Sequence, residues 1–396
     1  RYFWEVIKGE DRWKFLQSSV DVNKFYGGRE SVIDWVNNGV GIARLQGMQA
    51  WGKAGVAVKL MGEIPAMIYT GDVFDSNISP ITLTDESLIP SLWCFCESGE
   101  FAQAVRKIDQ SLKVTDASLL RVPFDLDRWQ KVADDRYPNG LPEPESDDPT
   151  QWLFHGRPEH ATATLQVAVC RLLGYRWPAE LDAKMRLSER ARELVESCDA
   201  LLSFADNDGI VCIPPVRGEA SAPERGLNLL ATAYGEAWSN DVLARLLKDA
   251  GFAGKSLESW LRDGFFSQHC ELFHERPFVW QVWDGLRDGF SALVNYHKLD
   301  RKNLETLIYT YLGDWIQRQK DDKASKIDGA QERLDAAESL QRRLELILHG
   351  ESPYDIFVRW KPIEEQGIGW SPDINDGVRM NIRPFLRVPD VKSKDA

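Results

Sequence analysis

Residues 85–112 read DESLIPSLWCFCESGEFAQAVRKIDQSL, and the spacing of apolar residues in this stretch predicts helices. Asp85 or Ser87 is placed to cap a first helix that runs through Trp93 to Glu97. A second helix follows, in which one face carries Phe101, Ala104, Val105, Ile108 and Leu112. This change to a helical period, after a Gly-rich beginning, decides the fold class.

The residues before this stretch have the pattern of strands and turns. SVIDWV at 31–36 and GVAVKL at 55–60 are short runs of β-branched and aromatic residues, separated by turn sequences such as NNG at 37–39. YGGR at 26–29 lacks the preceding strand that a cofactor-binding Gly-rich loop needs, so it is interpreted as a turn. Residues 1–131 are therefore predicted to form a mixed α+β domain.

The rest of the chain is predicted to be mainly helical, which makes the whole an α+β protein. Residues 132–160 are rich in Pro and acid and indicate a linker, and residues 161–350 form the helical domain. Ser239 and Ser256 are expected to cap helices at 241–250 and 257–266, respectively. Within the helical domain, residues 270–297 predict a Trp-rich hairpin, and residues 320–349 a long charged helix or helical hairpin. Residues 351–396 are expected to be an extended tail.

Composition excludes several classes of protein. The 396 residues include no apolar stretch of about 18, so no membrane span is expected, and no signal peptide is visible. The six Cys lie mostly in apolar runs, which indicates reduced core cysteines and a cytoplasmic location. The net charge of −13 argues against a generic nucleic-acid binder. Most of the excess acid follows residue 131, so a basic surface on the first domain remains compatible with the charge.

Two patterns that suggest metal chemistry are weak. His269 and His274, with Cys270 between them, do not share a helical face and lack an evident fourth ligand, so they are interpreted as core or surface residues. Asp373, Asp390 and Lys392 formally fit a metal-dependent nuclease, with residues 378–383 as an intervening strand. That nuclease is kept as a minor alternative. No metal is expected.

Several long segments carry a resemblance to a known family. They are QAWGKAGV at 49–56, IYTGDVFDSN at 68–77, LWCFCESGEF at 92–101, AVRKIDQSLKVT at 104–115, LRVPFDL at 120–126, DPTQWLFHG at 148–156, QHC at 268–270, GFSALVNYHKL at 289–299 and GWSPDINDGVR at 369–379. Together they resemble the target-recognition and C-terminal part of large adenine-specific DNA methyltransferases. These include type IIG restriction–modification enzymes, the BREX methyltransferase and the class 1 DISARM methylase.

The resemblance implies a role in sequence recognition without catalysis, with residues 1–131 as an α+β target-recognition domain. The family's catalytic domain carries a Gly-containing S-adenosylmethionine motif and an Asn/Asp-Pro-Pro-aromatic motif, and neither is present here. The adjacent prolines of this chain, Pro214 and Pro215, follow Cys212 and Ile213, which cannot accept the target amine. No catalytic or cofactor-binding residue is therefore assigned. S-adenosylmethionine and the methyl transfer would belong to a catalytic domain outside this chain, on the same gene or a separate one.

The expected partners are double-stranded DNA, that catalytic domain and other proteins of a phage-defence system. The predicted DNA-binding residues are basic residues among Gly-rich turns and Trp: Lys53, Arg44, Lys24, Arg29, Lys14, Arg12 and Lys59. Trp51 and Trp93 are expected in the core. Arg379 and Arg383 are expected to bond carboxylates within the fold, with contact to DNA as the alternative. The alternative function is an interaction scaffold of a defence complex, with residues 320–349 as its docking surface.

Overall fold

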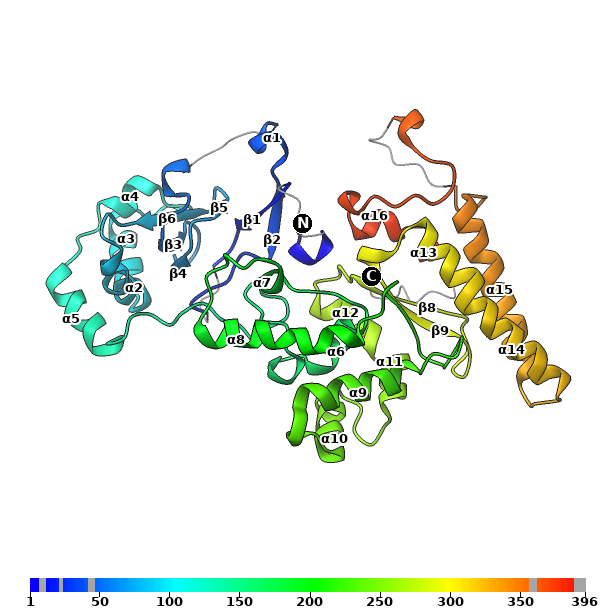
Figure 1. The fold of residues 1–396 in the computed structure, drawn as a ribbon. Helices are drawn as coiled ribbons and strands as arrows, with labels where there is room; N and C mark the ends of the chain where they lie inside the picture. The colour runs from blue at the N-terminus through cyan, green and yellow to red at the C-terminus, as the bar shows by residue number, and fades with distance from the viewer. Residues whose placement is uncertain (7–11, 21–23, 42–46, 356–361, 388–396) are drawn as a thin grey trace.

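The structure, a computed structural model, describes residues 1–6, 12–20, 24–41, 47–355 and 362–387. It confirms a mixed α+β fold in which small sheets accompany many helices (Figure 1). No helix in these ranges is both long and apolar enough to cross a membrane.

The strands of the described residues form three small sheets. Their bounds are β1 Trp13–Gln17, β2 Ser31–Asp34, β3 Gly55–Lys59, β4 Ala66–Tyr69, β5 Val73–Phe74, β6 Ile78–Thr82, β7 Ile210–Cys212, β8 Val279–Trp283 and β9 Ser291–Asn295. The strand orders are β2-β1-β5, β4-β3-β6 and β7-β9-β8. All pairs are antiparallel except β1 with β5. The predicted strands at 31–36 and 55–60 and the predicted hairpin within 270–297 are confirmed.

Helices make up most of the remainder. Their bounds are α1 Val36–Gly39, α2 Ile89–Glu97, α3 Glu100–Ile108, α4 Asp116–Leu120, α5 Leu126–Arg136, α6 Thr164–Leu172, α7 Pro178–Leu181, α8 Glu189–Ser197, α9 Ala222–Tyr234, α10 Asn240–Asp249, α11 Leu257–Asp263, α12 Phe265–Leu272, α13 Arg301–Glu305, α14 Leu312–Ala324, α15 Ala330–His349 and α16 Val378–Ile382. Asp85, Ser239 and Ser256 each accept a backbone N–H at a helix start, so these predicted caps are confirmed. The segment predicted at 320–349 lies in an antiparallel pair formed by α14 and α15 (Figure 1).

Two hydrophobic clusters organise the packing. The smaller one holds α2, α3 and α5 against the β4-β3-β6 sheet, through residues such as Val56, Trp93 and Val105. The larger one lies in the helical body, which we define as residues 152–349. Phe3 and Trp4 belong to this larger cluster, and the Trp4 indole donates to the carbonyl of Arg276 at 3.1 Å. The beginning of the chain thus packs with the body, and the domain boundaries stay a prediction.

Three local expectations are wrong. Leu112 is 75% exposed, because α3 ends at Ile108 and the chain turns before it reaches the predicted apolar face. The helix expected at 257–266 is interrupted at Gly264, where α12 begins. Residues 378–382 form the helix α16 instead of a strand, and Val378 and Ile382 are buried at a spacing of four residues.

Candidate nucleic-acid interface

The β1–β2 hairpin carries two of the predicted DNA-binding residues. Arg12 precedes β1 and donates to Asp34 at the end of β2, with distances of 3.1 and 2.8 Å. This hydrogen bond lowers the pKa of Asp34. Both side chains are partly exposed, so the pair contributes less than about 1 kcal/mol and leaves the guanidinium at the surface.

Lys14 and Lys53 are brought toward the same part of the surface by a pair of indoles. Lys14 is exposed, and its ammonium lies 4.9 Å from the centre of the Trp35 ring. The rings of Trp35 and Trp51 pack edge to face, with centroids 5.5 Å apart. Lys53 follows Trp51 by two residues and is exposed. Lys14 on the Trp35 ring and the exposed Lys53 near Trp51 in the chain are the candidate cationic patch for binding phosphates.

Lys24 and Lys59 are less available than this patch. The Lys24 ammonium is 3.0 Å from a carboxylate oxygen of Asp148, and both side chains are partly exposed. Lys59 ends β3 and is half-buried. No contact among the described residues brings Lys59 into the patch, and Arg44 lies outside the described residues.

Arg29 has a different environment from the one predicted. It is 6% exposed, its guanidinium lies 3.3 Å from the centre of the Trp152 ring, and it forms an ion pair with Asp72 at 2.7 Å. Burial lowers its pKa to about 10. A guanidinium held in this way cannot reach a phosphate without unpacking Trp152. The predicted DNA contact therefore does not fit Arg29. Its side chain instead joins the segment between β1 and β2 to Trp152 at the start of the body.

The Trp predictions are confirmed to different degrees. Trp93 is buried in the smaller cluster, as predicted. Trp51 is only half-buried, although its indole nitrogen is buried and has no hydrogen-bond partner within the described part of the chain. The six cysteines are all buried and free, which confirms the interpretation as reduced core residues.

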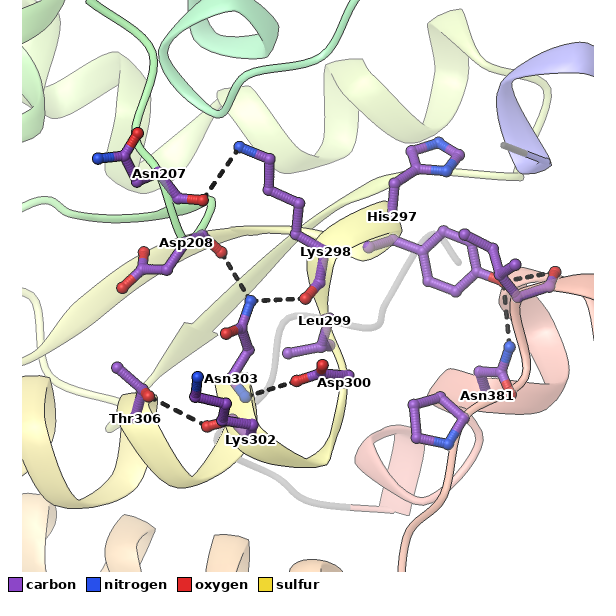
Figure 2. A pocket seen from close by; sticks show the side chains of 13 residues that line it. Asn207, Asp208, His297, Lys298, Leu299, Asp300, Lys302, Asn303, Thr306 and Asn381 are labelled. Atoms are coloured by element: carbon purple, nitrogen blue, oxygen red, sulfur yellow. Dashed lines mark hydrogen bonds between the residues drawn. The ribbon is translucent and has the colours of Figure 1, made fainter. Parts of the chain in front are cut away.

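A pocket of about 690 Å³ lies between the body and the C-terminal segment (Figure 2). The 296–306 region and the 207–208 loop form most of its wall, and Pro372, Ile374 and Asn381 complete it. Figure 2 shows Lys298 pointing to the carbonyl of Asn207, while Asn303 bridges the carbonyls of Asp208 and Lys298. These hydrogen bonds tie the loops to one another.

The titratable groups of the pocket also face the protein. Burial, followed by the proximity of Asp206, raises the pKa of Asp208 to about 6, and the Tyr311 hydroxyl donates to Asp208 at 3.0 Å. Burial lowers the pKa of Lys298, which donates to the Asp206 carbonyl at 2.7 Å. Lys302 is the exposed cation at the rim. The pocket is therefore better suited to holding the C-terminal segment than to catalysis.

The metal and nuclease patterns gain no support. His269 is fully buried, and its ring nitrogens contact Gln166 and the backbone N–H of Val279, which confirms a core histidine. Asp373 accepts the backbone N–H of Asn375. Asp390 and Lys392 lie outside the described residues. Within the described ranges, no three His, Cys, Asp or Glu side chains are grouped as metal ligands.

The adjacent prolines do not fit an amine-accepting methyltransferase motif. Cys212 and Ile213, which precede Pro214, are buried and have no carboxamide or carboxylate. These two residues therefore do not supply the amine-accepting motif that the resemblance implies for the catalytic domain.

Sequence reasoning missed the residues that hold the interface together. Asp72 and Trp152 fix Arg29 from positions 43 and 123 residues away in the chain. Asn375 accepts a hydrogen bond from the Trp13 indole at 3.2 Å. No local pattern marks such distant pairs, although the alternation of aromatic and basic residues at 12–15 indicated where aromatic–cation contacts form.

The comparison with known proteins gives one distant relative. No family model matches the chain. Over 88 residues, the chain is 32% identical to the adenine-specific methyltransferase PglX of Lacticaseibacillus casei (strain Zhang). This match covers 21% of the chain and 7% of that protein. The chain is thus distantly related to an adenine-specific methyltransferase and matches only a small part of it.

Proposed function

We propose that this chain is the DNA sequence-recognition portion of an adenine-specific DNA methyltransferase of a bacterial phage-defence system. The observation that carries the proposal is the similarity to an adenine-specific methyltransferase. The exposed lysines at positions 14 and 53, on either side of the Trp35–Trp51 pair, support it with a surface suited to DNA.

In this proposal, the chain selects the site and another domain performs the reaction. Lys14 and Lys53 contact phosphates and fix the register of the duplex, and loop side chains beside them contact base edges in the major groove. S-adenosylmethionine, bound outside this chain, supplies the methyl group. The catalytic domain holds the flipped adenine. The defence system is of the restriction–modification, BREX or DISARM type, in which methylation marks host DNA as self.

The test is a map of adenine methylation across the host genome, with the gene intact and deleted. We expect one sequence motif to lose methylation on deletion and to regain it when the intact gene is restored. Restoring the gene with K14Q and K53Q should return methylation only partly. An unchanged map after deletion contradicts the proposal.

The second candidate is an interaction scaffold within a defence complex. The observation that favours it is the α14–α15 pair, whose charged surface includes Glu332, Asp335 and Arg342 in exposed positions. The two functions differ in their response to salt. A scaffold should capture a protein and bind DNA weakly, whereas a recognition subunit should bind duplex DNA with an affinity that falls steeply as salt rises.

The nuclease remains a minor third candidate, with Asp373 and Asp390 as its metal-binding pair. If Asp373→Asn and Asp390→Asn leave DNA cleavage by the intact defence system unchanged, this candidate is excluded.

A further inference from the structure

The short helix α16 is anchored firmly to the rest of the protein. Val378 and Ile382 are buried in the larger cluster. The indole of Trp370 donates to the carbonyl of Asn381 at 2.7 Å, and the Asn381 amide donates to the Tyr296 hydroxyl at 3.1 Å. The outer face of α16 is therefore held in a fixed position.

That outer face carries two arginines that have no ion partner among the described residues. Arg379 and Arg383 are four residues apart, at the spacing that places side chains on one helical face, and both are exposed. Neither has a carboxylate within ion-pair distance among the residues that the structure describes. This corrects the expectation that they bond carboxylates within the fold. Like charges at this spacing repel, so the folded chain alone gives no reason for the pair.

Further contacts join α16 to the β1 strand. The Trp13 indole donates to Asn375, just before α16, at 3.2 Å. The guanidinium of Arg1 packs against Gly377, where any side chain would collide with it. Arg1 and Arg12 also lie 5.7 and 5.3 Å from the centre of the Trp13 ring. Figure 1 shows α16 beside the N-terminal segment, in agreement with these contacts.

We propose that Arg379 and Arg383 extend the DNA-binding surface of β1 and contact the phosphate backbone of duplex DNA. This inference rests on the proposed function and assigns to α16 a role in positioning the duplex. The surface comprises Arg1, Arg12, Lys14, Arg379 and Arg383, and it bends from the hairpin onto the C-terminal segment.

A phosphate backbone suits this surface because of its charge and its shape. The chain has a net charge of −13, so a polyanion is repelled elsewhere and needs a local concentration of cations. Guanidinium groups present donors in a fork that matches phosphate oxygens. A duplex offers phosphates along a line, and cations from β1 and α16 can contact several of them together.

The experiment compares salt-dependent binding of the full chain to a duplex that contains the methylated motif and to a scrambled duplex. The variant is R379Q with R383Q. The matched control is R190Q with R245Q, which removes two exposed arginines without ion partners from α8 and α10 of the body. Thermal unfolding of each variant verifies folding, and none of the four side chains is buried.

We expect R379Q/R383Q to weaken binding to both duplexes by roughly tenfold at moderate salt and to reduce the salt slope by about two units. The control should bind like the unchanged protein. If R379Q/R383Q binds like the unchanged protein, the inference is overturned while the proposed function stands. If it keeps DNA binding but loses capture of an acidic protein, the inference is also overturned. If the unchanged protein binds neither duplex, the proposed function fails as well.

Discussion

Arg171 in the helical body differs in burial and in ion partners from two basic residues of the proposed DNA-binding surface, Lys14 on β1 and Arg379 on α16. Arg171 on α6 is 2% exposed and bonds the buried Glu180 at 2.7 Å, with further hydrogen bonds to the carbonyl of Gly156. Lys14 and Arg379 are exposed and have no ion partner in the described part of the chain. The charge of Arg171 is therefore balanced inside the body, whereas the charges of Lys14 and Arg379 face solvent.

This difference shows why net charge is a poor guide to a local surface. Two cations can have the same charge and opposite roles, since one is fixed by a buried carboxylate and the other can meet a ligand. Arg29 lies between β1 and β2, yet it is buried and paired with a carboxylate, as Arg171 is in the body. The role of each cation therefore depends on its burial and on its ion partners, and variants that change either one test this conclusion.

The largest expected effect is a loss of stability of the helical body in acid. All six histidines follow residue 154, and burial lowers the pKa of His269 and His155 to about 3 and of His297 to about 4. Because these folded-state values lie below the ordinary value of 6.5, the unfolded chain binds more protons in acid. Stability from the neutral rings is present above pH 6.5 and is lost as the pH falls toward 4.

Hydrogen exchange from pH 7 to pH 4 measures this effect region by region. Amide protection of α6 and α12 should fall before that of β3 and α2, which lie in a part of the chain without histidine. The raised pKa of Asp208, caused first by burial, acts in the opposite direction, because its destabilising charge is removed as the pH falls below about 6. Equal loss of protection in both regions would contradict the comparison.

The second effect is on the buried ion pair. Arg171→Ala leaves Glu180 charged at 1% exposure, so the free energy of unfolding should fall by about 3–5 kcal/mol. Denaturant unfolding measures this change. Arg176→Ala is the control, because Arg176 contacts the same Glu180 at 3.5 Å but is 40% exposed and should cost less than about 1 kcal/mol. Similar losses for both variants would show that burial does not distinguish them.

The third effect concerns Arg29. Arg29→Lys should lower the free energy of unfolding by about 2 kcal/mol, because an ammonium cannot stack flat on Trp152 while it bonds Asp72. Unfolding followed by Trp fluorescence measures the loss. In DNA binding at a temperature where the variant stays folded, Arg29→Lys should behave like the unchanged protein. A stable variant with impaired DNA binding would restore Arg29 as a DNA contact.

The smallest expected effect is on the surface lysines. K14Q with K53Q should leave the unfolding temperature nearly unchanged and weaken duplex binding about tenfold, with a salt slope smaller by about two units. Lys255→Gln together with Lys248→Gln, on exposed positions of the body, should change neither binding nor slope. If both double variants weaken binding equally, general charge rather than a defined surface accounts for the affinity.

Local chemistry explains what the sequence predicted correctly. The caps Ser239 and Ser256 and the Trp-rich hairpin could be predicted, because each depends on residues that are close in the sequence. The strand predicted at 378–383 is wrong, because a pattern that alternates over six residues also fits a helix whose buried positions are four apart. The pairing of Arg29 with Trp152 depends on chain folding and left no local signal.

The candidate site was predictable in part for the same reason. Lys14 and Lys53 were predicted because they lie among aromatic residues and turns. The contact of Lys14 with Trp35, and the packing of Trp35 on Trp51, depend on the fold and have no local signal in the sequence. The exposure of Arg379 and Arg383 depends on which face of α16 packs inward, and the expectation of a strand concealed that face.

The most direct test of the central claim is the affinity of the full chain for duplex DNA between about 50 and about 200 mM salt. The account predicts a linear fall of log affinity with log salt, with a slope that corresponds to several released counterions, and a preference for the duplex that contains the methylated motif. Binding that is absent at low salt, or that does not change with salt, would contradict it.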